Sequence, residues 1–184
     1  MNKRKHAKSA SLDYKPRRTR LVKFIKRYYI SRDLFEKTVE VLRKRGRKKQ
    51  EGLVLWAGGA SADAEEAHVV SYIVPRRGHW GGGVRLDSKF LLKLSEELEK
   101  RDLLLLAQVH SHPGNFGHSP GDEKRAASYR IGFISIVVPC FALEKIHDLS
   151  ECYVYEYKGN WNWRLLEGSE ASSRFVVEDS LIRV

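Results

Sequence analysis

The sequence has few cysteines and no long apolar run. Cys140 and Cys152 are its two cysteines. A secreted disulfide scaffold usually carries more, so we expect two reduced thiols. The longest apolar stretches, near residues 103–109 and 134–138, are strand-length, well short of the ~20 residues that span a membrane. Residues 1–20 also lack the apolar core of a signal peptide. These absences predict a cytoplasmic protein without a membrane segment.

Acidic residues are too few to balance the basic ones. The chain has 34 Lys and Arg against 23 Asp and Glu, a formal net charge of +11. The excess gathers in residues 1–30, where Asp13 is the one acid, and in a second cluster at residues 43–49. Such tracts attract phosphates or acidic protein surfaces. A solvated tail and a cationic helix end, which suits the helix dipole, are the favoured interpretation. Nucleic acid and an acidic protein partner stay open as alternatives.

The pattern along the chain predicts one α/β domain at residues 21–184, preceded by a basic flexible arm at residues 1–20. Ser31 is a good N-cap for a helix that runs to about Arg45 and stops at Gly46. Asp87 or Ser88 caps a second helix, and a short third helix follows Ser119. Apolar runs predict strands at residues 21–30 (an edge strand), 53–57, 69–74, 103–110 (mid-sheet), 133–138, 152–157, 161–166 and 175–184.

The most informative residues follow the predicted mid-sheet strand. His110 and His112 are two residues apart, so strand alternation places both imidazoles on one side of the sheet. Asp122 lies in the first turn after Ser119-Pro120, and the turn-rich stretch 113–117 can fold it back toward the histidines. Two nitrogens and one oxygen leave a fourth tetrahedral position for water, as in catalytic zinc sites. We therefore predict one Zn²⁺ per chain held by His110, His112 and Asp122.

A metal-dependent hydrolase also needs a group that moves protons. Glu51, just before a buried strand, is the best candidate to take the proton of the attacking water and pass it to the leaving amine. Ser119 is the candidate that donates a hydrogen bond to the tetrahedral oxyanion. Its other interpretation is a plain N-cap with Pro120 at the first helical position, and both roles can coexist.

These residues together resemble the JAMM, or MPN-plus, metalloprotease family, especially its compact prokaryotic branch. The family pattern is an upstream Glu, then His-(Ser/Thr)-His-Pro, a short loop and Ser-x-x-Asp. Here the resemblance runs over residues 31–139, and the loop between His112 and Ser119 is one residue shorter than the commoner spacing. The matching residues are Glu51, His110, Ser111, His112, Pro113, Ser119 and Asp122.

The resemblance implies a JAB/MPN-like fold, a curved mixed β-sheet with flanking helices similar to that of cytidine deaminases. It also implies cleavage of the bond after the C-terminus of ubiquitin or a ubiquitin-like protein. The implied partners are that protein, its conjugates, and the activating or conjugating enzymes of the same pathway. His79 and Trp80, in the Gly-rich stretch 76–83, are predicted to line the substrate groove, against the alternative of an ordinary exposed loop.

Three other functions occur among proteins with related motifs or folds. A DNA-associated protein of the RadC type carries similar motifs, and the basic arm is the feature that favours it. A non-catalytic MPN scaffold would lack the metal ligands, which are all present here. A nucleoside deaminase would need a Cys-x-x-Cys after the histidine, and none follows. Nucleic-acid binding through the arm is not favoured, because a solvated tail is the preferred interpretation of that segment.

Overall fold

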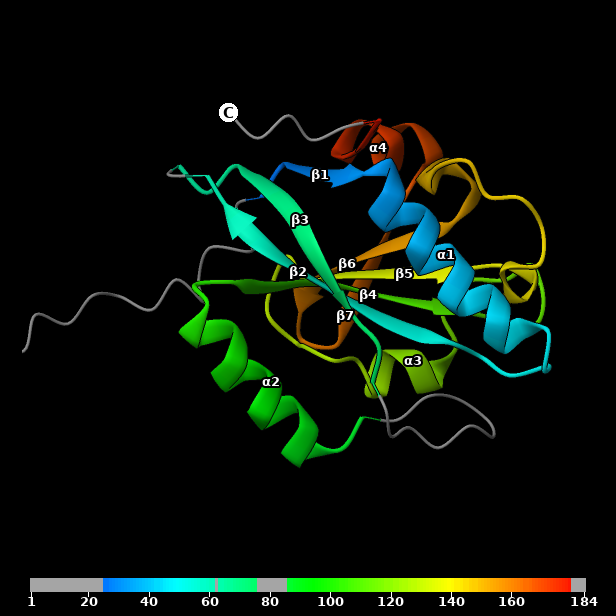
Figure 1. Cartoon of the computed structure of the whole chain (residues 1–184), viewed down its shortest axis with the longest axis horizontal. Coiled ribbons are helices and arrows are strands. Elements are labelled where there is room, and N and C mark those ends of the chain that lie inside the picture. Colours follow the sequence, from blue (N-terminus) through cyan, green and yellow to red (C-terminus); the bar gives the residue numbers. More distant parts are fainter. Residues whose placement is uncertain (1–24, 62, 76–85, 180–184) are drawn as a thin grey trace, which may run out of the picture.

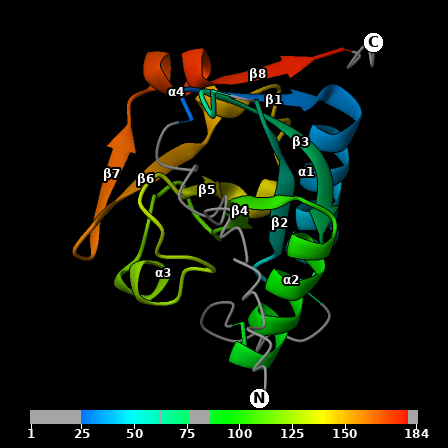
Figure 2. The same ribbon diagram turned by 90° about the vertical axis from the view of Figure 1, so that its left-hand side faces the viewer.

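The computed structural model describes residues 25–61, 63–75 and 86–179, so the predicted arm at 1–20 lies outside it. The fold is mixed α/β, with eight strands in one sheet that curls into a half-barrel and helices that flank it (Figures 1 and 2). The strands are β1 (Arg27–Ser31), β2 (Leu53–Ala60), β3 (Glu66–Ile73), β4 (Leu104–Ser111), β5 (Ile134–Val138), β6 (Tyr153–Gly159), β7 (Asn162–Leu166) and β8 (Phe175–Glu178). The helices are α1 (Arg32–Gly46), α2 (Ser88–Lys100), α3 (Pro120–Lys124) and α4 (Gly168–Arg174).

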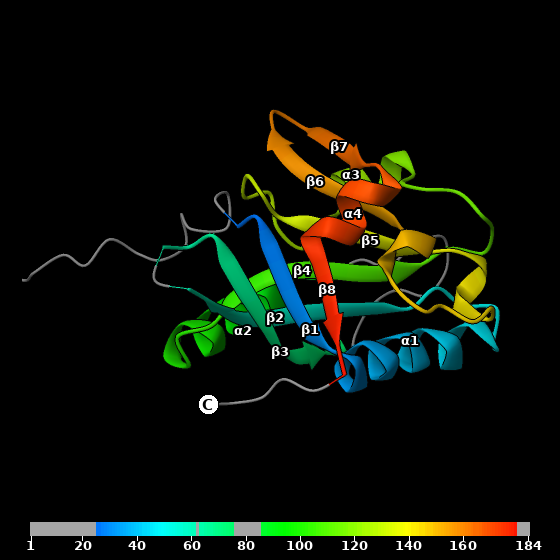
Figure 3. The same ribbon diagram turned by 90° about the horizontal axis from the view of Figure 1, so that it is seen from above.

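The strand order is β7-β6-β5-β4-β2-β3-β1-β8. The predicted central position of β4 is confirmed: it pairs antiparallel with β2 and parallel with β5. The prediction that residues 21–30 form an edge strand is wrong. β1 lies between β3 and β8 and pairs parallel with both, so β8 takes the edge instead (Figure 3).

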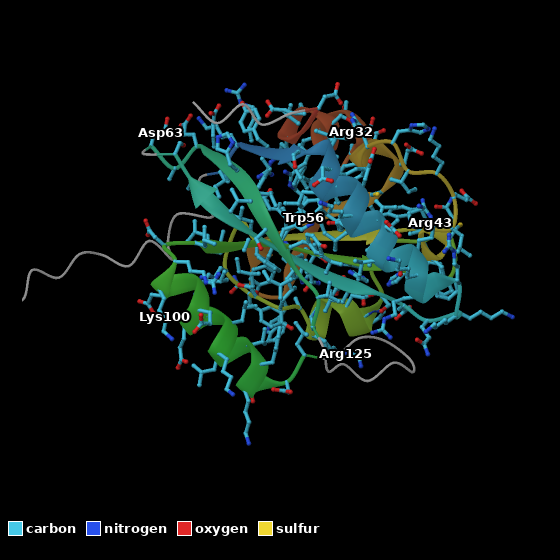
Figure 4. All side chains as sticks on the ribbon, in the orientation of Figure 1. Arg32, Arg43, Trp56, Asp63, Lys100 and Arg125 are labelled. Carbon is cyan, nitrogen blue, oxygen red and sulfur yellow. The ribbon has the colours of Figure 1, made fainter. Side chains whose placement is uncertain are left out.

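The helix α1 covers one face of the sheet (Figure 1). Ser31 caps it as predicted, its side chain accepting from the Leu34 N–H at 3.3 Å. Beneath it lies fully buried Trp56, whose indole N–H donates to the Thr38 hydroxyl at 3.0 Å (Figure 4). α1 ends at Gly46, as predicted. A Cβ there would lie 2.2 Å from the Phe141 carbonyl oxygen, so the glycine serves this close contact.

One extra residue in β4 decides which side chains face which way. Trp56 and Ala57 are consecutive in β2, but their partners in β4 are separated by Leu106, which has no partner across the ladder. This is a β-bulge, which often re-aims side chains beside functional sites. Leu106 and Ala107 both pack in the main core, on the α1 side. Alternation from Ala107 onward then turns His110 to the opposite face.

That opposite face carries a second, smaller core. α3 lies on this side of the sheet and α1 on the other (Figure 2). The core residues are Ala126, Phe133, Tyr157 and Trp163.

Within the described ranges, no helix combines the length and apolar character of a membrane span. Cys140 and Cys152 are free thiols, as expected. Burial raises the pKa of the Cys152 thiol to about 12, so this sulfur is protonated and unreactive near neutral pH.

Candidate metal centre

Three predicted ligands meet at the end of β4. One ligand atom each from His110, His112 and Asp122 lies within 4.8 Å of the others. The Nε2 atom of His110 is 3.4 Å from Asp122 Oδ1, and that of His112 is 3.2 Å from Asp122 Oδ2. Both imidazoles are nearly fully buried, and the carboxylate is only slightly exposed. The sequence pattern thus predicted correctly which side chains come together.

The charges of this cluster are strongly coupled. Burial alone would raise the pKa of Asp122, but contacts with the two histidines and with Ser119 hold it far below its usual range. Its carboxylate is therefore ionised at neutral pH. Burial would lower the pKa of His112, yet the carboxylates of Asp122 and Glu51 raise it above the usual value. The site thus offers a full negative charge beside two imidazoles.

The donor set fits a divalent cation. Of the two imidazole nitrogens that face Asp122, His110 Nε2 is buried and has no hydrogen-bond partner among the described residues. Buried polar atoms are normally satisfied, so an unpaired group calls for an explanation such as an ion. Imidazole nitrogens with a carboxylate oxygen are ligands that zinc and similar transition metals accept. The residues therefore match a metal site in both chemistry and spacing.

Asp122 is held in place by the start of α3, which lies next to the end of β4 (Figure 1). Its Oδ2 accepts from the Ser119 N–H at 2.7 Å and from the Ser119 hydroxyl at 2.6 Å. The Asp122 N–H in turn points to the Ser119 hydroxyl, at 3.4 Å. This reciprocal capping box fixes the helix and the carboxylate together. The predicted N-cap role of Ser119 is confirmed, and its hydroxyl proton is directed at Asp122.

Glu51 is positioned by the backbone beside the ligand strand. The Gly52 N–H donates to the Ser111 hydroxyl at 3.0 Å, and the Ser111 N–H donates to the Gly52 carbonyl at 3.1 Å. Leu53 pairs directly with His110. These bonds bring half-buried Glu51 next to the ligands, close enough for its charge to raise the pKa of His112.

A buried polar chain next to the ligands was missed by sequence reasoning. The Gln108 side chain accepts from the Ala127 N–H at 2.7 Å and donates to the Ser135 hydroxyl at 2.9 Å. The same hydroxyl lies 2.8 Å from His118 Nε2. Burial, and then the neighbouring His110, lower the pKa of His118 to about 3, so its ring is neutral. Gln108 had one available signal, its position two residues before His110 on the same face of the strand.

Two tyrosines of β6 anchor the loop between His112 and Ser119. The Tyr153 hydroxyl donates to the Asn115 side-chain oxygen at 3.0 Å. The Tyr155 hydroxyl accepts from the His118 N–H at 3.1 Å, and its ring stacks on that imidazole with centroids 3.8 Å apart. The loop, one residue shorter than the family's commoner spacing, is therefore tied down at both ends. The other predicted site residues, His79 and Trp80, lie outside the described residues.

The packing of Gly117 against Tyr155 gives a first prediction. A Cβ at Gly117 would lie 1.9 Å from the Tyr155 hydroxyl oxygen, so Gly117→Ala must displace that ring and weaken its bond to His118. We expect a loss of about 1–3 kcal/mol in the free energy of unfolding, measured by urea denaturation of the metal-free protein. Gly59→Ala is the control, because nothing lies within 4 Å of its Cβ. Equal effects of the two changes would show that the loop is not anchored this way.

No family model matches the chain. The chain resembles the solution structure of protein DSY2949 from Desulfitobacterium hafniense with a TM-score of 0.59. The similarity covers 84% of this chain and 95% of that one at 15% sequence identity, so it concerns the fold alone. A sequence relative is the probable metalloprotease y4jG of Sinorhizobium fredii, 35% identical over an alignment of 140 residues that covers 72% of this chain and 84% of the relative. At this identity and coverage, the chain belongs to the same family as that probable metalloprotease.

Proposed function

We propose that the chain is a zinc-dependent peptidase of the JAMM, or MPN-plus, type. It would hydrolyse the bond after the C-terminus of a ubiquitin-like protein, either to process a precursor or to remove the protein from a conjugate. The observation that carries the proposal is the buried cluster of His110, His112 and Asp122, with an imidazole nitrogen, His110 Nε2, that lacks a partner among the described residues. The metalloprotease relative supports the same class of reaction.

One Zn²⁺ per chain is the proposed cofactor, held by His110, His112 and Asp122. Two imidazoles and one carboxylate make a three-ligand protein set of the kind that catalytic zinc sites use, with capacity left for water or substrate. Bound there, zinc would acidify the attacking water and polarise the scissile carbonyl.

Two further side chains have proposed roles in the reaction. The Glu51 carboxylate would accept the proton of the attacking water and deliver it to the nitrogen of the leaving amine. The Ser119 hydroxyl would turn from Asp122 and donate to the oxyanion that forms on the scissile carbonyl. The capping box already holds the Ser119 hydroxyl oxygen beside the ligand Asp122. The two hydrogen bonds between Gly52 and Ser111 would keep Glu51 at a constant distance from the ligand strand.

The substrate class rests on the motif rather than on a contact. Glu51, the His-Ser-His-Pro run at 110–113 and the Ser-x-x-Asp at 119–122 stand in the order that the JAMM family uses. We propose accordingly that residues 21–184 form one JAB/MPN-like domain and act in the cytoplasm. The partners would be a ubiquitin-like protein, its conjugates, and the enzymes that activate or conjugate it.

Cleavage of a ubiquitin-like fusion tests this function. The fusion joins a ubiquitin-like protein from the same genome, through its C-terminal glycine, to a fluorescent reporter protein. Zinc-loaded protein should release the reporter, a chelator should stop the release, and added zinc should restore it. Release that continues at full rate in excess chelator would reject a metal-dependent reaction. Cleavage of unrelated peptides but of no ubiquitin-like fusion would reject the proposed substrate class and leave the peptidase.

A further inference from the structure

The basic cluster at residues 43–49 has two parts, which differ in the contacts that their side chains make. Arg43 donates to the carbonyls of Ala142 at 2.9 Å and Glu144 at 3.2 Å. Lys44 pairs with Glu40 at 3.0 Å. Both lie in the last turn of α1, where cations also favour the helix dipole. These residues stabilise the helix and its contact with the 3₁₀ turn Cys140–Ala142.

The second part consists of Arg47, which caps the C-terminus of α1, and the two lysines that follow it, Lys48 and Lys49. All three side chains are exposed, and no described carboxylate lies within ion-pair distance of any of them. The helix dipole favours positive charge at this helix end, but three adjacent charges also repel one another. The fold therefore uses the sign of these charges without giving any of the three side chains an ion-pair partner in the described structure.

Lys49 is held in a backbone conformation that a lysine disfavours. Its φ is 53°, in the left-handed region. The Gln50 N–H donates to the Arg45 carbonyl at 3.2 Å, and the Lys49 N–H donates to the Gly46 carbonyl at 2.8 Å. This is the pattern of a Schellman cap, in which the left-handed residue is usually glycine. Backbone strain of this kind tends to occur where a side chain serves a function.

The turn lies close to Glu51 along the chain. Lys49 precedes Glu51 by two residues, so their Cα atoms are within roughly 7 Å of each other. Glu51 is tied in turn to the ligand strand through the bonds between Gly52 and Ser111. A polypeptide bound beside Glu51 would therefore be within reach of the long side chains of this turn.

We infer that Arg47, Lys48 and Lys49 form a docking surface for an acidic segment of the polypeptide substrate, next to the bond that is cut. This inference rests on the proposed peptidase function and adds a preference for carboxylates near the cleavage site. Charge complementarity carries it: three exposed cations without ion-pair partners in the described structure lie beside a site that accepts a polypeptide. Single-stranded nucleic acid fits the turn less well, because residues 47–50 include no aromatic ring on which a base could stack.

Binding of a labelled peptide tests the surface without any turnover. The probe is a fluorescein-labelled peptide with four consecutive glutamates, compared with the same peptide carrying glutamines, and binding to full-length metal-free protein is read by anisotropy. The variant Arg47→Gln/Lys48→Gln/Lys49→Gln should bind the glutamate peptide about tenfold more weakly at low ionic strength, since each exposed ion pair contributes roughly a two- to threefold effect. Binding of the glutamine peptide should not change.

The control removes the same number of exposed charges far from the site. Lys93 and Lys100 lie on α2 and Arg101 follows it, just before the start of β4 and thus at the opposite end of this strand from His110. Lys100 and Arg101 pair with Glu97, so the control equals the variant in charge removed and not in ion pairing. The triple change of Lys93, Lys100 and Arg101 to glutamine should weaken binding less than twofold. Equal weakening by the two triple variants would overturn the inference, because net charge alone would then explain the binding. A larger loss for a single-stranded oligonucleotide than for the peptide would overturn it in favour of nucleic acid.

Two further measurements separate docking from folding and from catalysis. Lys49→Gly removes one charge and relieves the strained φ, so a two- to threefold weaker binding by this variant cannot come from unfolding. With a cleavable acidic peptide, the triple variant should raise KM and leave kcat unchanged, as expected for lost uniform binding. Absence of any cleavage by the wild type would count against the peptidase, while the anisotropy result would still decide the docking surface.

Discussion

Replacing Glu51 with glutamine is expected to lower kcat by about 10²–10⁴-fold, the usual contribution of a positioned acid–base group. Glutamine keeps the size of the side chain but cannot take up a proton. The change should leave the fold intact, because the segment is held by hydrogen bonds between Gly52 and Ser111 that do not involve the Glu51 side chain. Release of the reporter from a ubiquitin-like fusion, together with metal content by mass spectrometry, measures both effects.

The metal content separates this role from that of a ligand. Glu51→Gln should retain about one zinc per chain, since three other side chains form the proposed ligand set. Glu123→Gln is the control, because it removes a carboxylate next to Asp122 that has no assigned role. Turnover at the wild-type rate in Glu51→Gln would remove Glu51 from the mechanism, and loss of zinc would make it a ligand instead.

Changing Asp122 to asparagine should lower zinc affinity by about a hundredfold or more. Loss of a group that only supports a ligand typically lowers metal affinity by ~10–100-fold, so loss of a ligand should reach or exceed the upper end of that range. Asparagine offers a neutral oxygen in place of the ionised carboxylate that now lies 3.4 Å from His110 and 3.2 Å from His112. Competition with a chromophoric chelator measures the affinity directly. This measurement of zinc affinity does not depend on enzymatic activity.

The capping box of α3 supplies the comparison variants. Asparagine can still accept from the Ser119 N–H, whereas Asp122→Ala also loses the half of the capping box that the Asp122 side chain makes, which costs about 1 kcal/mol of stability in the metal-free protein. Ser119→Ala keeps the carboxylate and should retain most of the zinc. If Asp122→Asn bound zinc as tightly as the wild type, Asp122 would be a capping residue and not a ligand.

The candidate site was predictable because its signals are local in sequence. Strand alternation alone predicts that His110 and His112 share a face. Ser119 followed by Pro120 indicates the start of the short helix that carries Asp122. Glu51 precedes a second strand, and its prediction came from that position and from the family pattern; the pairing of β2 with β4 is seen only in the structure. The supporting residues Ser135 and Tyr155 come from β5 and β6, and no pattern in one strand reports the register of the next.

The fold errors have the same origin in long-range contacts. The end of α1 at Gly46 is predictable, but the contact that requires a glycine there, with the distant Phe141, is not. The mixture of apolar and basic residues in 21–30 favours an edge strand, whereas β1 pairs with β8 from the other end of the chain. The helix α4, Gly168–Arg174, was not predicted, since its serine-rich sequence is a weak helix former. Its last residue, Arg174, is held by an ion pair with buried Glu156 at 2.7 Å.

The bulge at Leu106 gives β4 one residue more than its ladder with β2 requires. Leu106 and Ala107 both pack in the main core, whereas Leu105 packs against the second, smaller core. Deletion of Leu106 would therefore restore an uninterrupted ladder with Leu105 and Ala107 still on opposite faces, and His110 would keep its direction. In a strand without a bulge, a one-residue shift turns every side chain to the other face. The extra residue thus lets the ligand strand lose one residue at this point without turning its histidines, although the core loses the Leu106 side chain.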